Sequence, residues 1–141
     1  MVLNILSTVS LVIELVVLIL LLSAYGLKKK SQYREHGLVM LSAVVLHWVT
    51  ILGVMVPSFA AYVGVPSPVN VYDATTALTF VHVAAGLIAA LLGVYLVTSW
   101  HLQKNLQSCF KRKRVMDAAI ALWILSIVLG IYIYVVIISA N

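Results

Sequence analysis

The chain has 141 residues, of which 64% are hydrophobic and only 9% are charged. A soluble domain averages roughly 25% charged residues, so this composition is typical of a membrane protein. The formal net charge is +5. The positions of the basic residues, given below, assign this charge to membrane topology and to contact with anionic lipid, and they argue against nucleic-acid binding.

Four apolar stretches follow one another along the chain: residues 3–25, 37–56, 74–100 and 118–140. Each has about the 20 residues needed to cross a hydrocarbon core about 30 Å thick. Because backbone groups in lipid must be paired within their own segment, we expect four α-helices. The sequence therefore predicts an all-α fold, an integral membrane four-helix bundle that forms a single transmembrane domain. The first helix is expected to be an anchor rather than a cleaved signal peptide.

All nine basic residues lie in two segments, four of them at 28–34 and five at 104–114. The positive-inside rule places both segments in the cytoplasm, so both termini are expected on the outer side of the membrane. The segment 57–73 holds all three prolines and no basic residue. This composition predicts an external loop that interrupts the helices.

His47 and His82 lie inside apolar stretches, where an ionisable side chain is costly and usually functional. His47 lies ten residues before Pro57, and His82 lies nine residues after Asp73. On adjacent antiparallel helices these two histidines should lie at nearly the same depth. Two facing imidazoles at one depth suit the axial ligation of a heme b iron from opposite sides.

His36 and His101 form a second candidate pair near the cytoplasmic surface. Eleven residues separate His36 from His47, a rotation of about 1100° that brings them to within about 20° of one helix face. His82 and His101 are about 100° apart on their helix, and the two rises, about 16 Å and about 28 Å, differ. One heme is therefore favoured over two. Both His36 and His101 remain either inner ligands or ordinary interfacial residues.

Small residues follow His82 along one helix face, with Gly86, Ala89 and Gly93 at four, seven and eleven positions further on. A neighbouring helix is the usual partner of such a face in membranes. The alternative is the edge of a macrocycle beside an axial histidine. In this heme interpretation, Gly86 and Gly93 make room for the porphyrin.

Glu14 is the other ionisable residue at predicted membrane depth. It either carries a proton or binds a quinol hydroxyl, or it is a protonated side chain that is hydrogen-bonded to a neighbouring helix. Zinc or copper is less favoured than heme, because the sequence offers no second cysteine, no clustered methionines and no nearby carboxylate to complete a ligand set. The sequence contains no hydrolase or nucleotide-phosphate motif.

Several short segments carry a family resemblance. They are Arg34-Glu35-His36 with Met40, Leu78-Thr79-Phe80-Val81-His82-Val83-Ala84, the basic loop, Leu122-Trp123 and Gly130-Ile131-Tyr132. Over residues 34–138 the chain thus resembles the YozB/CtaM-like family of small prokaryotic four-helix membrane proteins. The resemblance implies a multi-pass protein of a prokaryotic plasma membrane, linked to heme–copper oxidase maturation, with His36 and His82 at the family's histidine positions. The family usually has a histidine in the basic loop; this chain has none at 110–112, and His47 is an addition.

The favoured function is therefore that of a membrane b-type heme protein in respiratory electron transfer or oxidase biogenesis, an electron carrier or assembly protein rather than an enzyme. Its partners would be respiratory-chain or terminal-oxidase subunits, with quinone binding and a homo-oligomer left open. Two alternatives stay open as well. One is a cofactor-free assembly or scaffold protein, and the other is a small proton-coupled transporter that uses Glu14 and the histidines.

Overall fold

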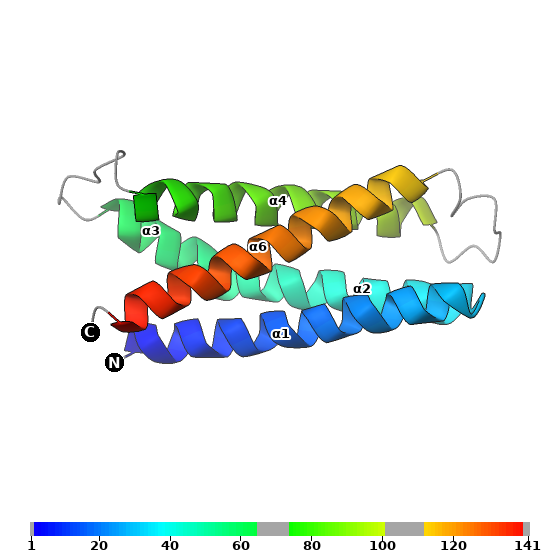
Figure 1. Ribbon diagram of the computed structural model, residues 1–141, viewed down its shortest axis with the longest axis horizontal. Coiled ribbons are helices and arrows are strands. Elements are labelled where there is room, and N and C mark those ends of the chain that lie inside the picture. Colours follow the sequence, from blue (N-terminus) through cyan, green and yellow to red (C-terminus); the bar gives the residue numbers. More distant parts are fainter. Residues whose placement is uncertain (1, 65–73, 101–111, 140–141) are drawn as a thin grey trace.

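The computed structural model describes residues 2–64, 74–100 and 112–139, and all of its regular elements are helices. Four segments are long and apolar enough to cross a membrane, which confirms the all-α class and the number of spans predicted. In chain order the elements are α1 (Val2–Lys29), α2 (Tyr33–Thr50), the π-helical segment η1 (Ile51–Met55), α3 (Val56–Gly64), α4 (Ala74–Trp100) and α6 (Lys113–Ser139) (Figure 1).

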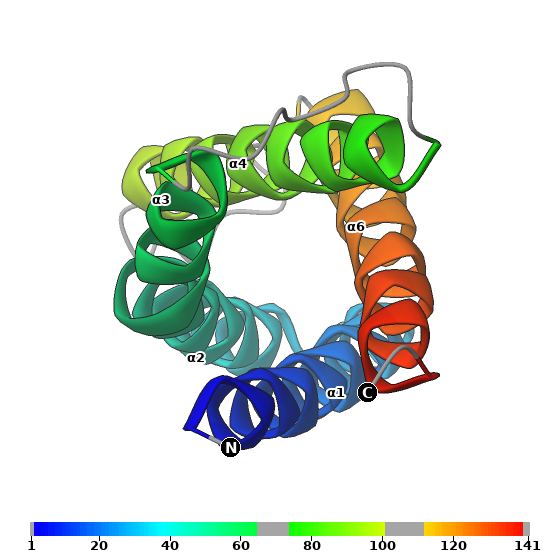
Figure 2. The ribbon, with the colours of Figure 1, turned by 90° about the vertical axis from the view of Figure 1, so that its left-hand side faces the viewer.

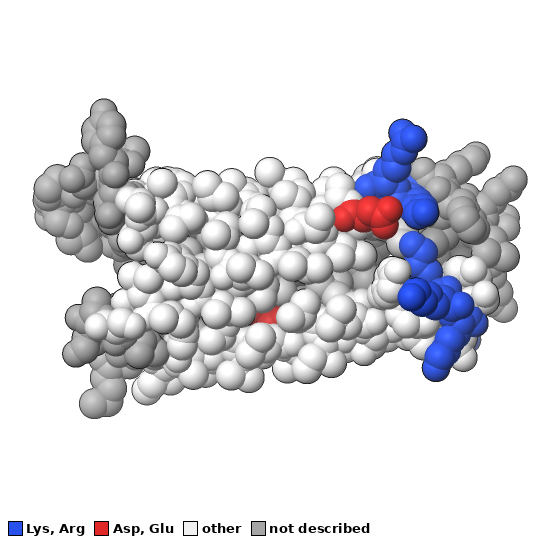
Figure 3. Space-filling model, viewed as in Figure 1, with Lys and Arg blue, Asp and Glu red and all other residues white. Residues whose placement is uncertain are grey.

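The four long segments form a bundle in which α1, α2 with α3, α4 and α6 follow one another around a common axis (Figure 2). α1 packs most closely against α2, and α4 against α6. Both chain ends lie at one end of the bundle, which we call the terminal end (Figure 1). The described Lys and Arg side chains gather at the opposite, basic end (Figure 3).

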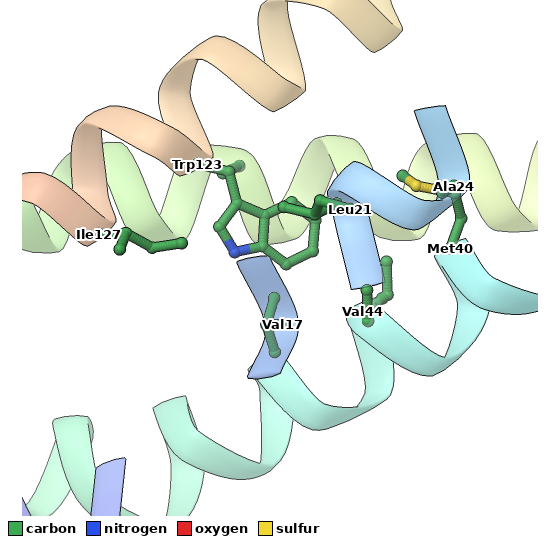
Figure 4. Close-up of a cluster of buried hydrophobic side chains, with 9 residues drawn as sticks. Val17, Leu21, Ala24, Met40, Val44, Trp123 and Ile127 are labelled. Carbon is green, nitrogen blue, oxygen red and sulfur yellow. The ribbon is translucent and has the colours of Figure 1, made fainter. Parts of the chain in front are cut away.

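Apolar side chains cover much of the outer surface, and the interior holds polar and small side chains together with apolar ones. This distribution is the one expected where the surroundings are as apolar as the protein. A cluster of buried apolar residues, here called the apolar core, joins α1, α2, α4 and α6 (Figure 4). Its members are Val17, Leu21, Ala24, Met40, Ala43, Val44, Ala89, Trp123 and Ile127.

The second span does not end at Pro57, as the sequence had suggested, but remains helical to Gly64. In η1 the Val56 N–H bonds to the carbonyl of Ile51, five residues back. This wider π-helical turn lies directly before the proline, whose ring would clash with the carbonyl four residues earlier in a regular α-helix. Pro57 is the second residue of α3, and it has no N–H to continue the bonding of the preceding turn.

At the basic end, the turn between α1 and α2 passes through Ser31, whose φ of 59° is in the left-handed region. The start of α2 packs directly against the end of α4, since a Cβ atom on Gly37 would overlap the Trp100 ring. At the terminal end, the hydroxyls of Thr8 and Tyr134 lie 3.0 Å apart and join α1 to α6. Helices are therefore in contact at both ends of the bundle, α2 with α4 at the basic end and α1 with α6 at the terminal end.

Candidate functional site

A carboxylate–imidazole pair lies in the centre of the bundle. Glu14 of α1 accepts a hydrogen bond at Oε1 from His47 Nδ1 of α2, at 2.8 Å. The Glu14 residue is 6% exposed and His47 is 1% exposed. A charge buried this deeply needs a partner of opposite sign or a shared proton, and the pair supplies both. Glu14 is hydrogen-bonded to a neighbouring helix, as one of the two interpretations of this residue required, whereas the expectation of no carboxylate near the histidines was wrong.

Thr50, one turn after His47, completes this group. Its hydroxyl lies 2.6 Å from Glu14 Oε1 and 2.8 Å from the His47 carbonyl oxygen. A hydroxyl has one hydrogen to donate, so Thr50 serves one of these acceptors at a time. When Glu14 is ionised, the Thr50 hydroxyl donates to the carboxylate. When Glu14 holds a proton, the hydroxyl can donate to the His47 carbonyl oxygen instead.

The other faces of His47 are also occupied. Its Nε2 lies 3.4 Å from the Gly86 carbonyl oxygen of α4, a long contact that a proton on Nε2 would use. The Trp123 ring of α6 lies 4.7 Å from the His47 ring, centroid to centroid, with a tilt of 47°. Side chains or backbone from all four spans therefore surround this imidazole, and they fix its orientation.

His82 belongs to a different contact, between α4 and α6. Its Nδ1 donates to the Ser126 carbonyl oxygen at 2.8 Å, and the Ser126 hydroxyl donates to the His82 carbonyl oxygen at 3.3 Å. A Cβ atom on Gly130 would come within 3.0 Å of the His82 ring, so this glycine leaves space for the imidazole. His82 is only partly buried and faces α6 rather than α2.

The structure corrects the expected depth of the two central histidines. His47 lies level with Gly86, which is four residues, or about one helical turn of 5.4 Å, away from His82. The expected match was counted from Pro57, and the helix continues past that residue. His47 is therefore nearer to the basic end than His82 is.

The small-residue face of α4 packs against other helices. A Cβ atom on Gly86 would come within 2.9 Å of Ser126 Oγ, and one on Gly93 within 2.9 Å of Val44 Cγ2. Ala89 is fully buried in the apolar core. The space beside both glycines is thus filled by side chains of α6 and α2. This agrees with helix packing, rather than room for a macrocycle, as the role of these small residues.

The second histidine pair is described only in part. His36 Nδ1 donates to the Ala24 carbonyl oxygen at 2.7 Å and so ties the start of α2 to α1. His101 lies outside the described residues. Its neighbour Trp100 packs on Gly37, next to His36.

A heme b bridging His47 and His82 does not fit this packing. Such a heme needs an Nε2 lone pair from each ring aimed at one iron. His47 Nε2 instead faces the Gly86 carbonyl, and Trp123 covers the ring. An apolar groove of about 400 Å³ does lie between α2 and α4, but no histidine lines it. His82 and His36 donate through Nδ1, which leaves Nε2 as the lone-pair nitrogen of each ring.

Among residues 2–64, 74–100 and 112–139, no three His, Cys, Asp or Glu side chains come close enough together to hold a metal ion. Comparisons of the chain with protein-family models, with curated proteins and with solved structures found no match. The YozB/CtaM-like resemblance, and the oxidase and quinone partners that it implies, therefore stay predictions from short motifs.

Buried polar side chains are confined to one half of the described bundle. They lie at the bundle centre or between it and the terminal end, whereas the apolar core extends from the centre toward the basic end. The buried polar set comprises Ser10, Glu14, His47, Thr50, Thr76 and Ser126. We call the half from the bundle centre to the terminal end the polar half. The Glu14–His47 pair thus lies at the bundle centre, where the polar half meets the apolar core.

The sequence contained a signal for this pair that we did not use. Glu14 lies fifteen residues before the end of α1 at Lys29, and His47 lies fourteen residues after the start of α2 at Tyr33. Counting from this short turn, rather than from the proline-rich segment, places the two at one depth. Thr50 and Ser126 gave no such signal, because hydroxyl residues are common in membrane helices and usually bond to their own backbone.

Proposed function

We propose that the chain is a multi-pass protein of a cell membrane, with both termini outside. Four long apolar helices, an apolar outer surface and the gathering of basic residues at one end support this placement. In lipid, the polar interior of the terminal half is then the part of the chain that needs a functional explanation.

Within the bundle, we propose that Glu14 and His47 form a proton-binding centre of the kind that a small proton-coupled transporter requires. The observation that carries the proposal is the 2.8 Å hydrogen bond between Glu14 Oε1 and His47 Nδ1, at a site where neither side chain is more than 8% exposed. Intramembrane carboxylates and histidines are the usual groups of proton relays.

Transfer of the proton breaks the N–H bond at His47 Nδ1 and forms an O–H bond at Glu14 Oε1. Uptake of one proton at His47 Nε2 first converts a carboxylate–imidazole pair of net charge −1 into a carboxylate–imidazolium pair of net charge zero. The transfer then gives a carboxyl–imidazole pair at the same net charge, and release of the proton reverses these steps. In both states of net charge zero, Nε2 keeps its hydrogen, which faces the Gly86 carbonyl oxygen at 3.4 Å. Thr50 turns its single hydroxyl hydrogen from Glu14 to the His47 carbonyl as the carboxylate is neutralised.

Proton access is one-sided in this arrangement. Polar side chains such as Ser10, Thr50 and Thr76 lie between the pair and the terminal end, whereas the apolar core lies between the pair and the basic end. Protons cross apolar barriers poorly, so the pair exchanges with the outer solution. A bound proton reaches the cytoplasmic side only when the core rearranges, as in a coupled carrier rather than an open channel.

Infrared difference spectroscopy of the protein in lipid nanodiscs tests the proposal. As pH is changed, a carboxyl C=O stretching band should appear and disappear, be absent in Glu14→Gln and shift in Thr50→Val. Thr98→Val is the matched control, because the Thr98 hydroxyl is exposed and bonds only to carbonyls of its own helix. Its spectrum should equal that of the wild type.

Two outcomes would overturn the proposal. A Glu14 carboxyl that keeps one protonation state at every accessible pH is a structural tie between α1 and α2, as expected of a cofactor-free scaffold. A red preparation with a bis-histidine heme b spectrum, lost in both His47→Gln and His82→Gln, would instead support the heme function that the sequence favoured.

A further inference from the structure

Two polar atoms at the bundle centre are left without a hydrogen-bond partner among the described residues. They are Glu14 Oε2 and Trp123 Nε1. Their residues are 6% and 0% exposed, so bulk solvent does not reach them. An unpaired polar atom in such surroundings costs about 1–3 kcal/mol, so each of the two atoms calls for a hydrogen-bond partner.

Both atoms belong to residues that contact the His47 ring. Glu14 is bonded to the edge of the His47 ring through its other oxygen, and Trp123 packs on the face of that ring. Figure 4 shows the indole nitrogen of Trp123 on the side of its ring that faces the α1 segment carrying Val17. Glu14 precedes Val17 by three residues and therefore projects from the same face of α1.

The chemistry of the two atoms selects the ligand. The Trp123 N–H can only donate, whereas Glu14 Oε2 accepts when ionised. A cation would be repelled by the N–H group, and an anion by the carboxylate. A small neutral molecule that accepts one hydrogen bond and donates another satisfies both atoms, and water is the smallest of these.

We infer that one water molecule is bound in the bundle centre, accepting from Trp123 Nε1 and donating to Glu14 Oε2. It joins α6 to the hydrogen-bonded group on α1 and α2, at the border between the polar half and the apolar core. This site goes beyond the proposed proton centre and depends on two unpaired atoms, not on proton exchange. The infrared titration can therefore fail while the water site stands, and the reverse also holds.

Trp48 provides an internal control for this inference. Its Nε1 is also buried and unpartnered. No carboxylate is bonded beside it, and the groove that Trp48 lines between α2 and α4 is entirely apolar in its lining surface. Among the described residues, two buried indole N–H groups without a partner can thus be compared, and only that of Trp123 belongs to a residue that packs on the imidazole bonded to Glu14.

The test is water-edited NMR on protein with ¹⁵N-labelled indoles in nanodiscs, with Trp48→Phe and Trp123→Phe used for assignment. The Trp123 N–H should give a cross-peak to a long-lived water, and that of Trp48 should give none. In Glu14→Leu the Trp123 cross-peak should fall to the level of Trp48. A wild-type Trp123 N–H without a water cross-peak, or one that is unchanged in Glu14→Leu, would overturn the site.

A second measurement covers the case in which Glu14→Leu does not fold. Infrared difference spectra between H₂¹⁸O and H₂¹⁶O report the O–H stretch of an individual bound water. We expect one sharp band that is present in the wild type and in Trp48→Phe and is lost in Trp123→Phe. A band that persists in Trp123→Phe, or no band in the wild type, contradicts the inference.

Discussion

The two halves of this bundle share an apolar outer surface and differ in the polar side chains that they bury. Toward the basic end the helices are joined by apolar side chains such as Val17, Leu21 and Val44. From the centre toward the terminal end, the buried set instead includes Glu14, His47 and other polar side chains. In lipid, apolar packing needs no special partner, but every buried polar atom does. The polar half is therefore the half in which a single substitution leaves an unpaired group behind.

The largest effect that we expect comes from separating the central pair. Glu14→Leu leaves His47 without its acceptor and should lower the free energy of unfolding by about 3–5 kcal/mol, because a buried ionisable group loses its partner. Unfolding in mixed detergent micelles, followed by circular dichroism, measures this loss. Ser23→Ala is the control, since the Ser23 hydroxyl is exposed and bonds to its own helix at Ile19.

The double variant Glu14→Leu/His47→Leu sharpens the result. Removing both partners leaves no unpaired ionisable group, so much of the lost stability should return. If the two losses simply add, the pair is not coupled and the 2.8 Å contact does not describe the folded protein.

An intermediate effect is expected in the apolar half. A Cβ atom on Gly93 would lie 2.9 Å from Val44 Cγ2, so Gly93→Ala should force α2 and α4 apart at a cost of about 1–3 kcal/mol. Gly26→Ala provides the matched control. Among the described residues, no atom outside the chain neighbours and the adjacent helix backbone lies within 4 Å of the added methyl there. The substitution should leave stability unchanged or raise it by about 0.5–1 kcal/mol.

The same unfolding assay compares the two glycines. Equal losses in Gly93→Ala and Gly26→Ala would mean that the backbone, and not the close approach of α2, determines the effect. A loss confined to Gly93→Ala supports helix packing, instead of a bound macrocycle, as the role of the small-residue face of α4.

Hydropathy alone was enough to predict the four spans, because each span must be apolar over its whole length. The limits of 74–100 agree at both ends with α4, whereas the second span was predicted to end too early. A proline usually ends a helix, and the sequence carries no mark of the π-helical turn that lets this helix continue through Pro57.

The candidate site was predicted less well than the fold. Composition identified Glu14, His47 and His82 as unusual at membrane depth, and the structure brings two of them together. Composition did not reveal that the His82 side chain points to α6. The direction of a histidine side chain depends on the rotation of its helix and on the register of α4 against α6. A short turn fixes the register between α1 and α2, but no such short turn joins α4 to α6.

The smallest loss of unfolding free energy is expected from His82→Phe, because His82, unlike His47, has no buried ionisable partner in the hydrogen bonds described above. His82 Nδ1 donates to the Ser126 carbonyl, an oxygen that also accepts the helical bond of α6. In His82→Phe this oxygen therefore stays paired, and no buried charge is left behind. Hydrogen bonds between membrane helices average about 0.6 kcal/mol and reach about 1.7 kcal/mol, so the loss should fall in this range. A loss as large as that of Glu14→Leu would mean that His82 holds something besides this carbonyl, and the spectrum of the purified protein would show whether that is a heme.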